Sequence, residues 1–206
     1  MKNLLITMSF ILFSPLLFSS EKSIDKPRTI LFIGDSLTAG YGVDKDKSYV
    51  ALIEKDLKGK GMNVKVLNGS VSGSTTSSGI KRLRWFLKAK PEILVLALGA
   101  NDGLRGVKLE TSKKNLDDII ELAKKNDIDV ALAGMMLPPN YGPDYTKKFK
   151  QMYLDLVKKH KVVHIPFLLE GVAAERELNQ ADGIHPNEKG HLIMKGTVLK
   201  YLEKML

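Results

Sequence analysis

The chain has 206 residues and a net charge of +9, and this length is enough for one domain with a substantial hydrophobic core. It contains no cysteine, which excludes disulfide bonds, thiol chemistry and lipid attachment to an N-terminal cysteine. A positive charge of this size can indicate binding to nucleic acid or to an anionic membrane. Because lysine is spread over several helical segments, we expect a solvated surface and no nucleic-acid partner, which leaves weak contact with an anionic membrane surface as an option.

The first twenty residues have the layout of a secretory signal peptide. A short basic start, Met1-Lys2-Asn3, is followed by an uncharged run over residues 4–18 and then by small and polar residues. The run is short for a hydrocarbon core ~30 Å thick, so a membrane anchor is the weaker alternative. We therefore predict a signal peptide at 1–20, a single domain at 21–206 and a bacterial periplasmic or secreted location.

Strand-like and helix-like segments alternate through the rest of the chain. The predicted strands cover residues 29–33, 63–67, 93–98, 128–135 and 162–166, and the predicted helices cover residues 48–60, 80–90, 109–126, 145–160 and 188–206. Alternation of this kind implies a parallel sheet with helices on both faces. We therefore predict an α/β fold, a three-layer α/β/α, flavodoxin-like arrangement around a parallel sheet of about five strands.

A short polar motif, Gly34-Asp35-Ser36-Leu37, follows the first predicted strand. In open α/β sheets ligands bind at the carboxyl ends of the strands, which is where Ser36 would lie. An exposed hydroxyl group at such a place is a candidate nucleophile. The alternative is that Asp35 or Ser36 only caps the next helix, since both residue types are common N-caps.

A second motif near the other end of the chain, Asp182-Gly183-Ile184-His185-Pro186, places an acid and an imidazole three residues apart in a turn. A nucleophilic serine needs a base within hydrogen-bond reach and a third group that orients the base, so this turn could supply both partners. The alternative is an ordinary surface histidine. Three other histidines compete for the role: we expect His160 to face water and His164 to be packed, and we keep His191 as a minor alternative.

Two glycine-rich stretches, at residues 69–79 and 99–103, each follow a predicted strand. Acyl transfer needs hydrogen-bond donors aimed at a developing oxyanion, and backbone N–H groups and asparagine amides are common suppliers. Glycine also lets a backbone N–H group approach a ligand closely. The alternative for both stretches is a simple turn, because Gly, Asn, Asp and Ser are frequent in turns.

Taken in order, these motifs resemble the sequence blocks of the SGNH (GDSL) hydrolase family. The matching residues are Gly34-Asp35-Ser36-Leu37, Gly73, Gly99-Ala100-Asn101-Asp102 and Asp182-Gly183-Ile184-His185-Pro186. The intervening residues are similar to the bacterial periplasmic branch of that family, the multifunctional lysophospholipase, acyl-CoA thioesterase I and arylesterase group. The resemblance extends from residue 29 to the C-terminus.

This resemblance implies a serine esterase with Ser36 as nucleophile, His185 as general base and Asp182 as the group that orients His185. It implies that the oxyanion is held by the Ser36 N–H group, the Gly73 N–H group and the Asn101 side chain. It also implies small-molecule substrates, namely aryl esters, lysophospholipids and acyl thioesters, with no cofactor and no metal ion. We expect the enzyme to be a monomer.

The loop at residues 137–143 follows the fourth predicted strand, on the sheet edge predicted for the site. We predict that Leu137 and Tyr141 bind substrate by walling the acyl pocket, and the alternative is a plain connector. Two rival functions stay open. One is a carbohydrate O-acetyl esterase of the same fold, and the other is a flavodoxin-like module that binds a phosphate or flavin through residues 72–79. The second is disfavoured because the loop after the first strand carries Asp35, whose charge would repel phosphate.

Overall fold

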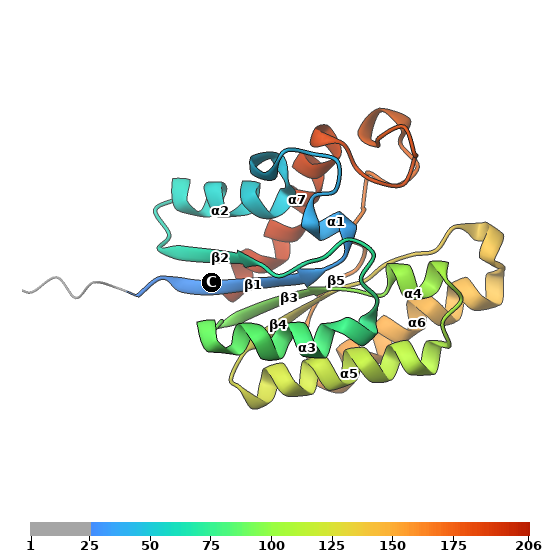
Figure 1. Ribbon diagram of the computed structural model, residues 1–206, viewed down its shortest axis with the longest axis horizontal. Coiled ribbons are helices and arrows are strands. Elements are labelled where there is room, and N and C mark those ends of the chain that lie inside the picture. Colours follow the sequence, from blue (N-terminus) through green and yellow to red (C-terminus); the bar gives the residue numbers. More distant parts are fainter. Residues whose placement is uncertain (1–25) are drawn as a thin grey trace, which may run out of the picture.

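The computed structural model describes residues 26–206, so the predicted signal peptide lies outside the described residues. Five parallel strands form one sheet in the order β2-β1-β3-β4-β5 (Figure 1). The strands are β1 (Arg28–Gly34), β2 (Val64–Asn68), β3 (Ile93–Ala97), β4 (Asp129–Ala133) and β5 (Val163–Ile165). The predicted α/β fold around a parallel sheet is confirmed.

Helices cover both faces of the sheet and give the three predicted layers (Figure 1). One face carries α2 (Tyr49–Gly59) and α7 (Glu188–Leu202), and the other carries α3 (Thr76–Phe86), α5 (Leu109–Lys125) and α6 (Pro143–His160). Two short helices, α1 (Ser36–Ala39) and α4 (Ala100–Leu104), follow β1 and β3. Single 3₁₀ turns lie at Lys45–Lys47, Leu87–Ala89, Pro139–Tyr141, Arg176–Leu178 and Glu203–Met205. Within residues 26–206, no helix combines the length and the apolar character that crossing a membrane requires.

The central strands run through the middle of the hydrophobic core. Side chains at residues 30–33 of β1 and at 93–98, in and just after β3, are buried. Because helices cover both faces, these strands have no solvent-facing side, and an unbroken apolar run replaces the alternation of a half-exposed strand. The register pairs Gly34 with Ala97, so the residues after β1 and after β3 leave the sheet side by side. Neighbouring loops therefore meet at the carboxyl edge of the sheet.

The structure differs from the predicted elements where a long-range contact sets a helix end. Helix α3 begins at Thr76 rather than at residue 80, because the Thr76 N–H group donates to a carboxylate oxygen of Asp102 at 2.8 Å. The Thr76 hydroxyl group donates to the other oxygen of the same carboxylate at 2.5 Å. The sequence pattern does not predict α4 either, since its five residues contain the Asn-Asp-Gly combination typical of a turn.

Candidate active site

Ser36 is the first residue of α1, at the point where β1 ends. The Oδ1 atom of Asp35 accepts a hydrogen bond from the Leu37 N–H group at 3.1 Å, so Asp35 caps α1 and leaves the Ser36 hydroxyl group available. Gly40 ends the helix at a φ of 78°, in the left-handed region that favours glycine. The backbone is thus fixed on both sides of a half-buried serine.

Three side chains from two distant parts of the chain form one line of hydrogen bonds. The Nε2 atom of His185 lies 2.9 Å from Ser36 Oγ, and His185 Nδ1 lies 2.7 Å from Asp182 Oδ2. Ser36 and His185 are 149 residues apart in sequence, so only the fold brings them together. If the Ser36 hydroxyl group donates to Nε2, the ring proton of His185 must be on Nδ1, where it is donated to Asp182. The arrangement can remove a proton from the serine.

Backbone N–H groups of the turn that contains Asp182 and His185 hold the Asp182 carboxylate in place. The Oδ1 atom of Asp182 accepts hydrogen bonds from the N–H groups of Ile184 and His185, each at 3.0 Å. The His185 N–H group, followed by the His185 ring and the Ile184 N–H group, lowers the pKa of Asp182 to about 2. Asp182 is therefore ionised at neutral pH. An ionised acceptor favours the His185 tautomer that can accept a proton from Ser36.

Gln180 and Tyr41, which sequence reasoning missed, join the His185 turn to the segment after α1. The Nε2 atom of Gln180 donates to the carbonyl oxygens of Tyr41 at 2.7 Å and Pro186 at 3.0 Å. The Tyr41 ring lies against the His185 ring, with 4.7 Å between the two centroids. The closeness of Tyr41 to Ser36 in sequence was the available signal for that residue, whereas nothing in the sequence marks Gln180.

Asn101 and Gly73, the predicted oxyanion donors, share a contact with Arg105. The Nη2 atom of Arg105 donates to the Gly73 carbonyl oxygen at 3.2 Å and to Asn101 Oδ1 at 3.3 Å. The Nδ2 atom of Asn101 donates to the Ser74 carbonyl oxygen at 3.1 Å and to Asp35 Oδ2 at 3.3 Å. A flipped amide would turn its NH2 group towards the Arg105 guanidinium, so these partners fix the amide orientation. Arg105 stands four residues after Asn101, a helical contact spacing that could have revealed it.

Asp35 is buried beside the candidate nucleophile. It is 2% exposed, and burial raises its pKa from 3.8 to about 6, although hydrogen bonds from the Leu37 N–H group and the Asn101 amide act in the opposite direction. Through these two contacts Asp35 links α1 to α4. Its protonation at mildly acidic pH would weaken one of the acceptors of the Asn101 amide.

The two residues predicted to bind substrate, Leu137 and Tyr141, lie after β4 and pack towards α4. Leu137 is only 9% exposed, and its side chain occupies the space beside Gly103. The Tyr141 hydroxyl group donates to the Leu104 carbonyl oxygen at 3.1 Å. Both residues therefore support α4, the short helix that contains Asn101. Their contact with substrate stays a prediction.

The three remaining histidines occupy other surroundings. His191, the alternative base, is buried in α7, where its Nδ1 atom accepts from the Tyr49 N–H group at 3.2 Å. Burial lowers the pKa of His191 to about 4, which keeps it neutral. His164 is half-buried in β5. The expectation that His160 faces water is wrong, because α5 covers the end of α6 and the His160 side chain is 7% exposed against Asp117.

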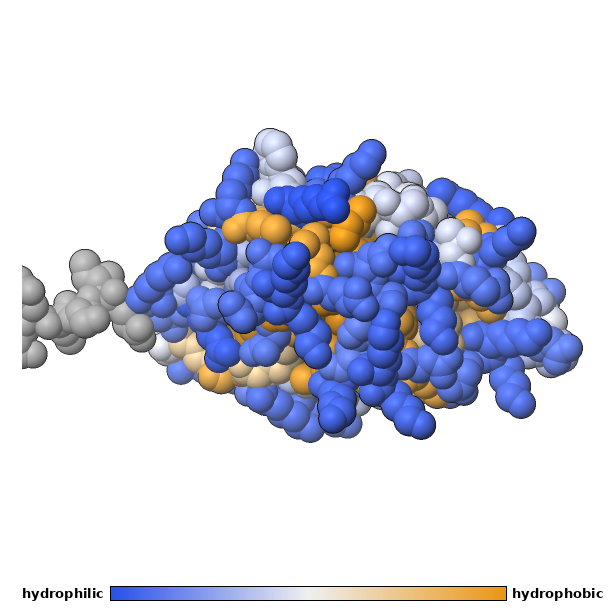
Figure 2. All heavy atoms as spheres, turned by 90° about the horizontal axis from the view of Figure 1, so that it is seen from below, coloured by the Kyte–Doolittle hydropathy of each residue, from blue (hydrophilic) through white to orange (hydrophobic). Residues whose placement is uncertain are grey.

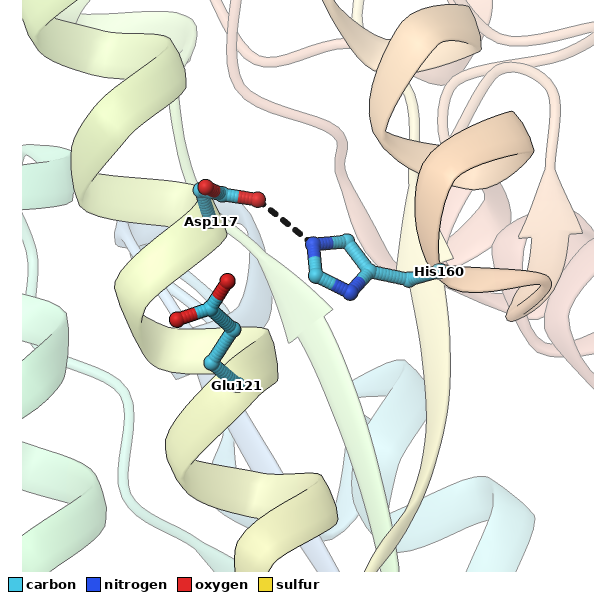
Figure 3. Close-up of side chains that lie close together, drawn as sticks. All are labelled: Asp117, Glu121 and His160. Carbon is cyan, nitrogen blue, oxygen red and sulfur yellow. Dashed lines mark hydrogen bonds and ion pairs between the residues drawn. The ribbon is translucent and has the colours of Figure 1, made fainter.

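A group of potential metal ligands lies between α5 and α6. Asp117 and Glu121 of α5 lie close to His160, the last residue of α6 (Figure 3), with ligand atoms within 4.8 Å of one another. The Nζ atom of Lys159 lies 2.6 Å from Asp117 and 3.1 Å from Glu121, so an ammonium group already pairs with both carboxylates. This group lies at the amino edge of the sheet, since α6 ends just before β5 begins. We interpret it as an ion-pair network that joins two helices.

Comparison with known proteins identifies the family. The model of the GDSL-like Lipase/Acylhydrolase family matches residues 32–193. An arylesterase of Vibrio mimicus is 36% identical over 200 residues, which cover 97% of this chain and 98% of that protein. The Thioesterase 1/protease 1/lysophospholipase L1 of Escherichia coli K12 is 34% identical over 179 residues, covering 86% of this chain and 85% of that protein. The crystal structure of TesA has a TM-score of 0.84 at 37% identity and covers 86% of this chain and 99% of that chain.

The family match spans most of the chain and includes the motifs of Ser36, Asn101 and His185. It confirms the resemblance to SGNH hydrolases and removes the flavodoxin-like binding module as an alternative. The matched regions cover 98% and 85% of these two relatives, so the likeness is not confined to one segment. The chain belongs to the GDSL-like lipase/acylhydrolase family and is a carboxylic ester hydrolase.

Proposed function

We propose that Ser36, His185 and Asp182 are the catalytic triad of this esterase. The observation that carries the proposal is the continuous line of hydrogen bonds from Asp182 through His185 to Ser36, with lengths of 2.7 and 2.9 Å. Both lengths are suitable for proton transfer between neighbouring groups. The buried and neutral His191 offers no comparable contact to Ser36 among residues 26–206.

In the proposed first half-reaction, His185 Nε2 takes the proton of Ser36 as Oγ attacks the carbonyl carbon of the substrate. The tetrahedral intermediate then collapses, and the bond to the leaving oxygen or sulfur breaks. His185 delivers its proton to the leaving atom, and the acyl group stays on Ser36 as an ester. Ionised Asp182 stabilises the His185 imidazolium that forms between these two proton transfers.

In the second half-reaction a water molecule takes the place of the serine. His185 removes a proton from the water as its oxygen attacks the acyl carbon, and the new tetrahedral intermediate expels Ser36 Oγ. His185 returns the proton to Ser36, which releases a carboxylic acid and restores the free enzyme. The same hydrogen-bonded geometry thus acts in both halves of the reaction.

We propose the Ser36 N–H group, the Gly73 N–H group and Asn101 Nδ2 as donors to the oxyanion. Gly73 lies in an exposed loop at a φ of 76°, a conformation that favours glycine and leaves its backbone open to close approach. Both hydrogens of Asn101 Nδ2 face protein acceptors in this structure. An oxyanion would replace the longer contact, to Asp35, with a charge-assisted hydrogen bond.

The proposed substrates are aryl esters, lysophospholipids and acyl thioesters. The names of the Vibrio mimicus arylesterase and the Escherichia coli thioesterase/lysophospholipase support this choice. A carbohydrate O-acetyl esterase is the alternative. A hydrolysis panel of p-nitrophenyl esters graded by acyl length, an acyl-CoA, a lysophospholipid and an acetylated sugar separates the two, and a clear preference for the acetylated sugar would favour the alternative.

We also propose that Leu137 and Tyr141 border the acyl pocket. A buried CH₂ group of an acyl chain is worth up to ~0.8 kcal/mol, so an apolar wall would grade substrates by length. Tyr141→Phe keeps the apolar ring, removes only the hydrogen bond to Leu104 and serves as the control, whereas Leu137→Asn replaces a nearly buried apolar side chain with a polar one and tests the wall. In Leu137→Asn we expect kcat/KM to fall more for long-chain esters than for acetate esters. An equal reduction for every ester would show that this loop does not select substrates by acyl length.

Export and a monomeric state complete the proposal. Removal of the signal peptide at residues 1–20 would deliver the single domain at 21–206 to the periplasm or the medium of a bacterial host. N-terminal sequencing of protein recovered from the periplasmic fraction tests this, and an intact Met1 would contradict it. Light scattering of the exported protein measures its mass, and a stable dimer would contradict the proposed monomer.

Ser36→Ala tests the proposed triad. Because triad members act as a unit, we expect kcat for p-nitrophenyl esters to fall by about 10³-fold or more. The urea unfolding curve should stay close to that of the wild type, since the change removes one half-buried hydroxyl group. Near-normal turnover by a folded Ser36→Ala protein would refute the mechanism.

A further inference from the structure

Helix α3 and the turn after it carry a concentrated positive charge that the proposed reaction does not use. Residues 76–90 contain five basic residues and no acidic residue. The basic residues are Lys81, Arg82, Arg84, Lys88 and Lys90. This tract is an exception to the expectation that the positive charge is dispersed over the helices.

The charge of the tract is not compensated within the described part of the chain. No carboxylate among residues 26–206 forms an ion pair with any of the five cations. Three acidic residues of the adjacent helix α5 form ion pairs with lysines that lie outside the tract. Lys114 lies 2.6 Å from Asp118, and Lys159 binds both Asp117 and Glu121. The outer surface of α3 is therefore available to an anionic partner.

Trp85, the only tryptophan of the chain, lies in the middle of this tract. It is 64% exposed, and Lys88 Nζ lies 3.7 Å from the centroid of its ring. Lys81 and Trp85 lie four residues apart on α3, and Lys88, in the turn after it, contacts the Trp85 ring, so these three exposed side chains form an outward stripe with exposed Arg84 beside them. We call these four residues the α3 stripe. An indole ring among cations is typical of segments that lie at a membrane–water interface.

The α3 stripe lies on a side of the molecule rather than at the edge that carries Ser36. Figure 1 shows α3 running along the sheet, below it in that view, while the nucleophile follows the carboxyl end of β1. Figure 2 looks at the molecule from below, the side that α3 and α5 cover, and shows hydrophilic side chains over most of it with apolar groups between them. A flat partner bound to this side would not need to cover Ser36.

We propose that the α3 stripe binds the surface of an anionic phospholipid bilayer. Unpaired lysine and arginine side chains would attract the lipid headgroups, and the Trp85 ring would enter the headgroup region, where tryptophan is enriched. A nucleic acid would also attract the cations. The described surface of the stripe offers one exposed ring, however, whereas strand-binding proteins stack successive bases on several aromatic side chains. This inference does not depend on the triad.

Vesicle sedimentation of the mature protein tests the proposal. The probe is phosphatidylcholine vesicles with about one third phosphatidylglycerol, compared with pure phosphatidylcholine vesicles. The α3 variant is Lys81→Gln/Arg84→Gln/Lys88→Gln. The matched control is Lys147→Gln/Lys148→Gln/Lys150→Gln on α6, which removes the same charge from exposed lysines without a neighbouring tryptophan.

We expect the wild type to bind the anionic vesicles and not the neutral ones. The α3 variant should bind about 100-fold more weakly, because each cation near an anionic surface contributes ~1 kcal/mol and ~1.4 kcal/mol is tenfold. The α6 control should lose about threefold or less, since its cations lie on another helix. Added salt should release the wild type from the vesicles.

The fluorescence of Trp85 reports the contact directly, because it is the only tryptophan. We expect a blue shift with anionic vesicles and none with neutral vesicles. Hydrolysis of a soluble ester by every variant checks folding, and the single change Lys88→Gln replaces the triple variant if the latter does not fold. Absence of wild-type binding, or equal losses in the α3 and α6 variants, would overturn the proposal. Tighter binding to a duplex DNA oligonucleotide than to the vesicles would assign the stripe to nucleic acid instead.

Discussion

Two aspartate–histidine pairs in this molecule have similar chemistry and different surroundings. In the pair at the carboxyl edge of the sheet, Asp182 lies 2.7 Å from His185. In the pair between α5 and α6, Asp117 forms the same kind of contact with His160. The second ring nitrogen of His185 reaches a serine hydroxyl group at 2.9 Å, whereas the Asp117 carboxylate is shared with a lysine.

The comparison teaches that a hydrogen-bonded pair does not by itself indicate catalysis. What distinguishes the Asp182–His185 pair is the Ser36 hydroxyl group on the far side of the ring and a location where loops from several strands meet. Among residues 26–206 the Asp117–His160 pair has no such hydroxyl partner, and it joins two helices near the amino edge of the sheet. The predictions below test this distinction, beginning with the largest expected effect.

Removal of each imidazole tests the comparison most strongly. His185→Ala should lower kcat by about 10³-fold or more, because the base is lost. His160→Ala should leave kcat within about twofold and lower the free energy of unfolding by about 1–3 kcal/mol, because it removes a buried ring and its hydrogen bond. Ester hydrolysis and urea unfolding of both variants provide the measurements. A folded His160→Ala protein without activity, beside an active His185→Ala protein, would reverse the assignment.

Asn101→Ala extends the comparison from the pair to the groups around it. Loss of an oxyanion donor should lower kcat by about 10²–10³-fold with little change in KM, since the donor acts mainly in the transition state. Steady-state kinetics with a p-nitrophenyl ester separate the two parameters. A change confined to KM would show that Asn101 binds substrate and does not stabilise the oxyanion.

Arg105→Ala should have a smaller effect, because Arg105 contacts Asn101 and the Gly73 carbonyl oxygen and would act on the proposed oxyanion site through them. We expect a loss of about tenfold in kcat, with KM nearly unchanged and partial rescue by Arg105→Lys. In the Asn101→Ala background the Arg105→Ala change should cost less than it does alone. Fully additive losses would place the action of Arg105 outside the Asn101 contact. Arg82→Ala, on α3, is the matched control.

The two carboxylates near Ser36 should differ in their dependence on pH. The pKa of buried Asp35 is raised from 3.8 to about 6, whereas that of Asp182 is lowered to about 2. The contribution of Asp35 to stability is therefore fully present below about pH 3.8 and is lost as the pH rises through about 6. The asparagine of Asp35→Asn does not titrate, so the free energy of unfolding of this variant minus that of the wild type should increase by about 2–3 kcal/mol as the pH rises from about 4 to about 8. Urea unfolding at several pH values measures this gain, and a constant difference would contradict the raised pKa.

Much of the fold follows from local patterns in the sequence. Buried strands such as the run at residues 30–33 are recognisable because a parallel sheet covered on both faces needs unbroken apolar segments. The same edge-of-sheet logic indicated Ser36, and the short turn of Asp182 and His185 could be linked to it through family motifs. These features depend on residue types or on neighbours in sequence, and both can be recognised in a single sequence.

Other features depend on contacts that no local pattern encodes. The start of α3 is set by Asp102, which is 26 residues away from Thr76. Gln180 clamps Tyr41 across 139 residues. His160 looked exposed because it ends a basic helix, yet α5 buries it. In each case the decisive partner comes from another element of the fold.

Covalent labelling of the free enzyme tests the proposed triad most directly. A fluorophosphonate probe reacts with a serine hydroxyl group only where a base removes its proton. We predict a single adduct, located on Ser36 by peptide mass spectrometry, with labelling nearly abolished in His185→Ala and unchanged in His160→Ala. An adduct on another residue, or labelling that survives the loss of His185 and fails with the loss of His160, would contradict the assignment.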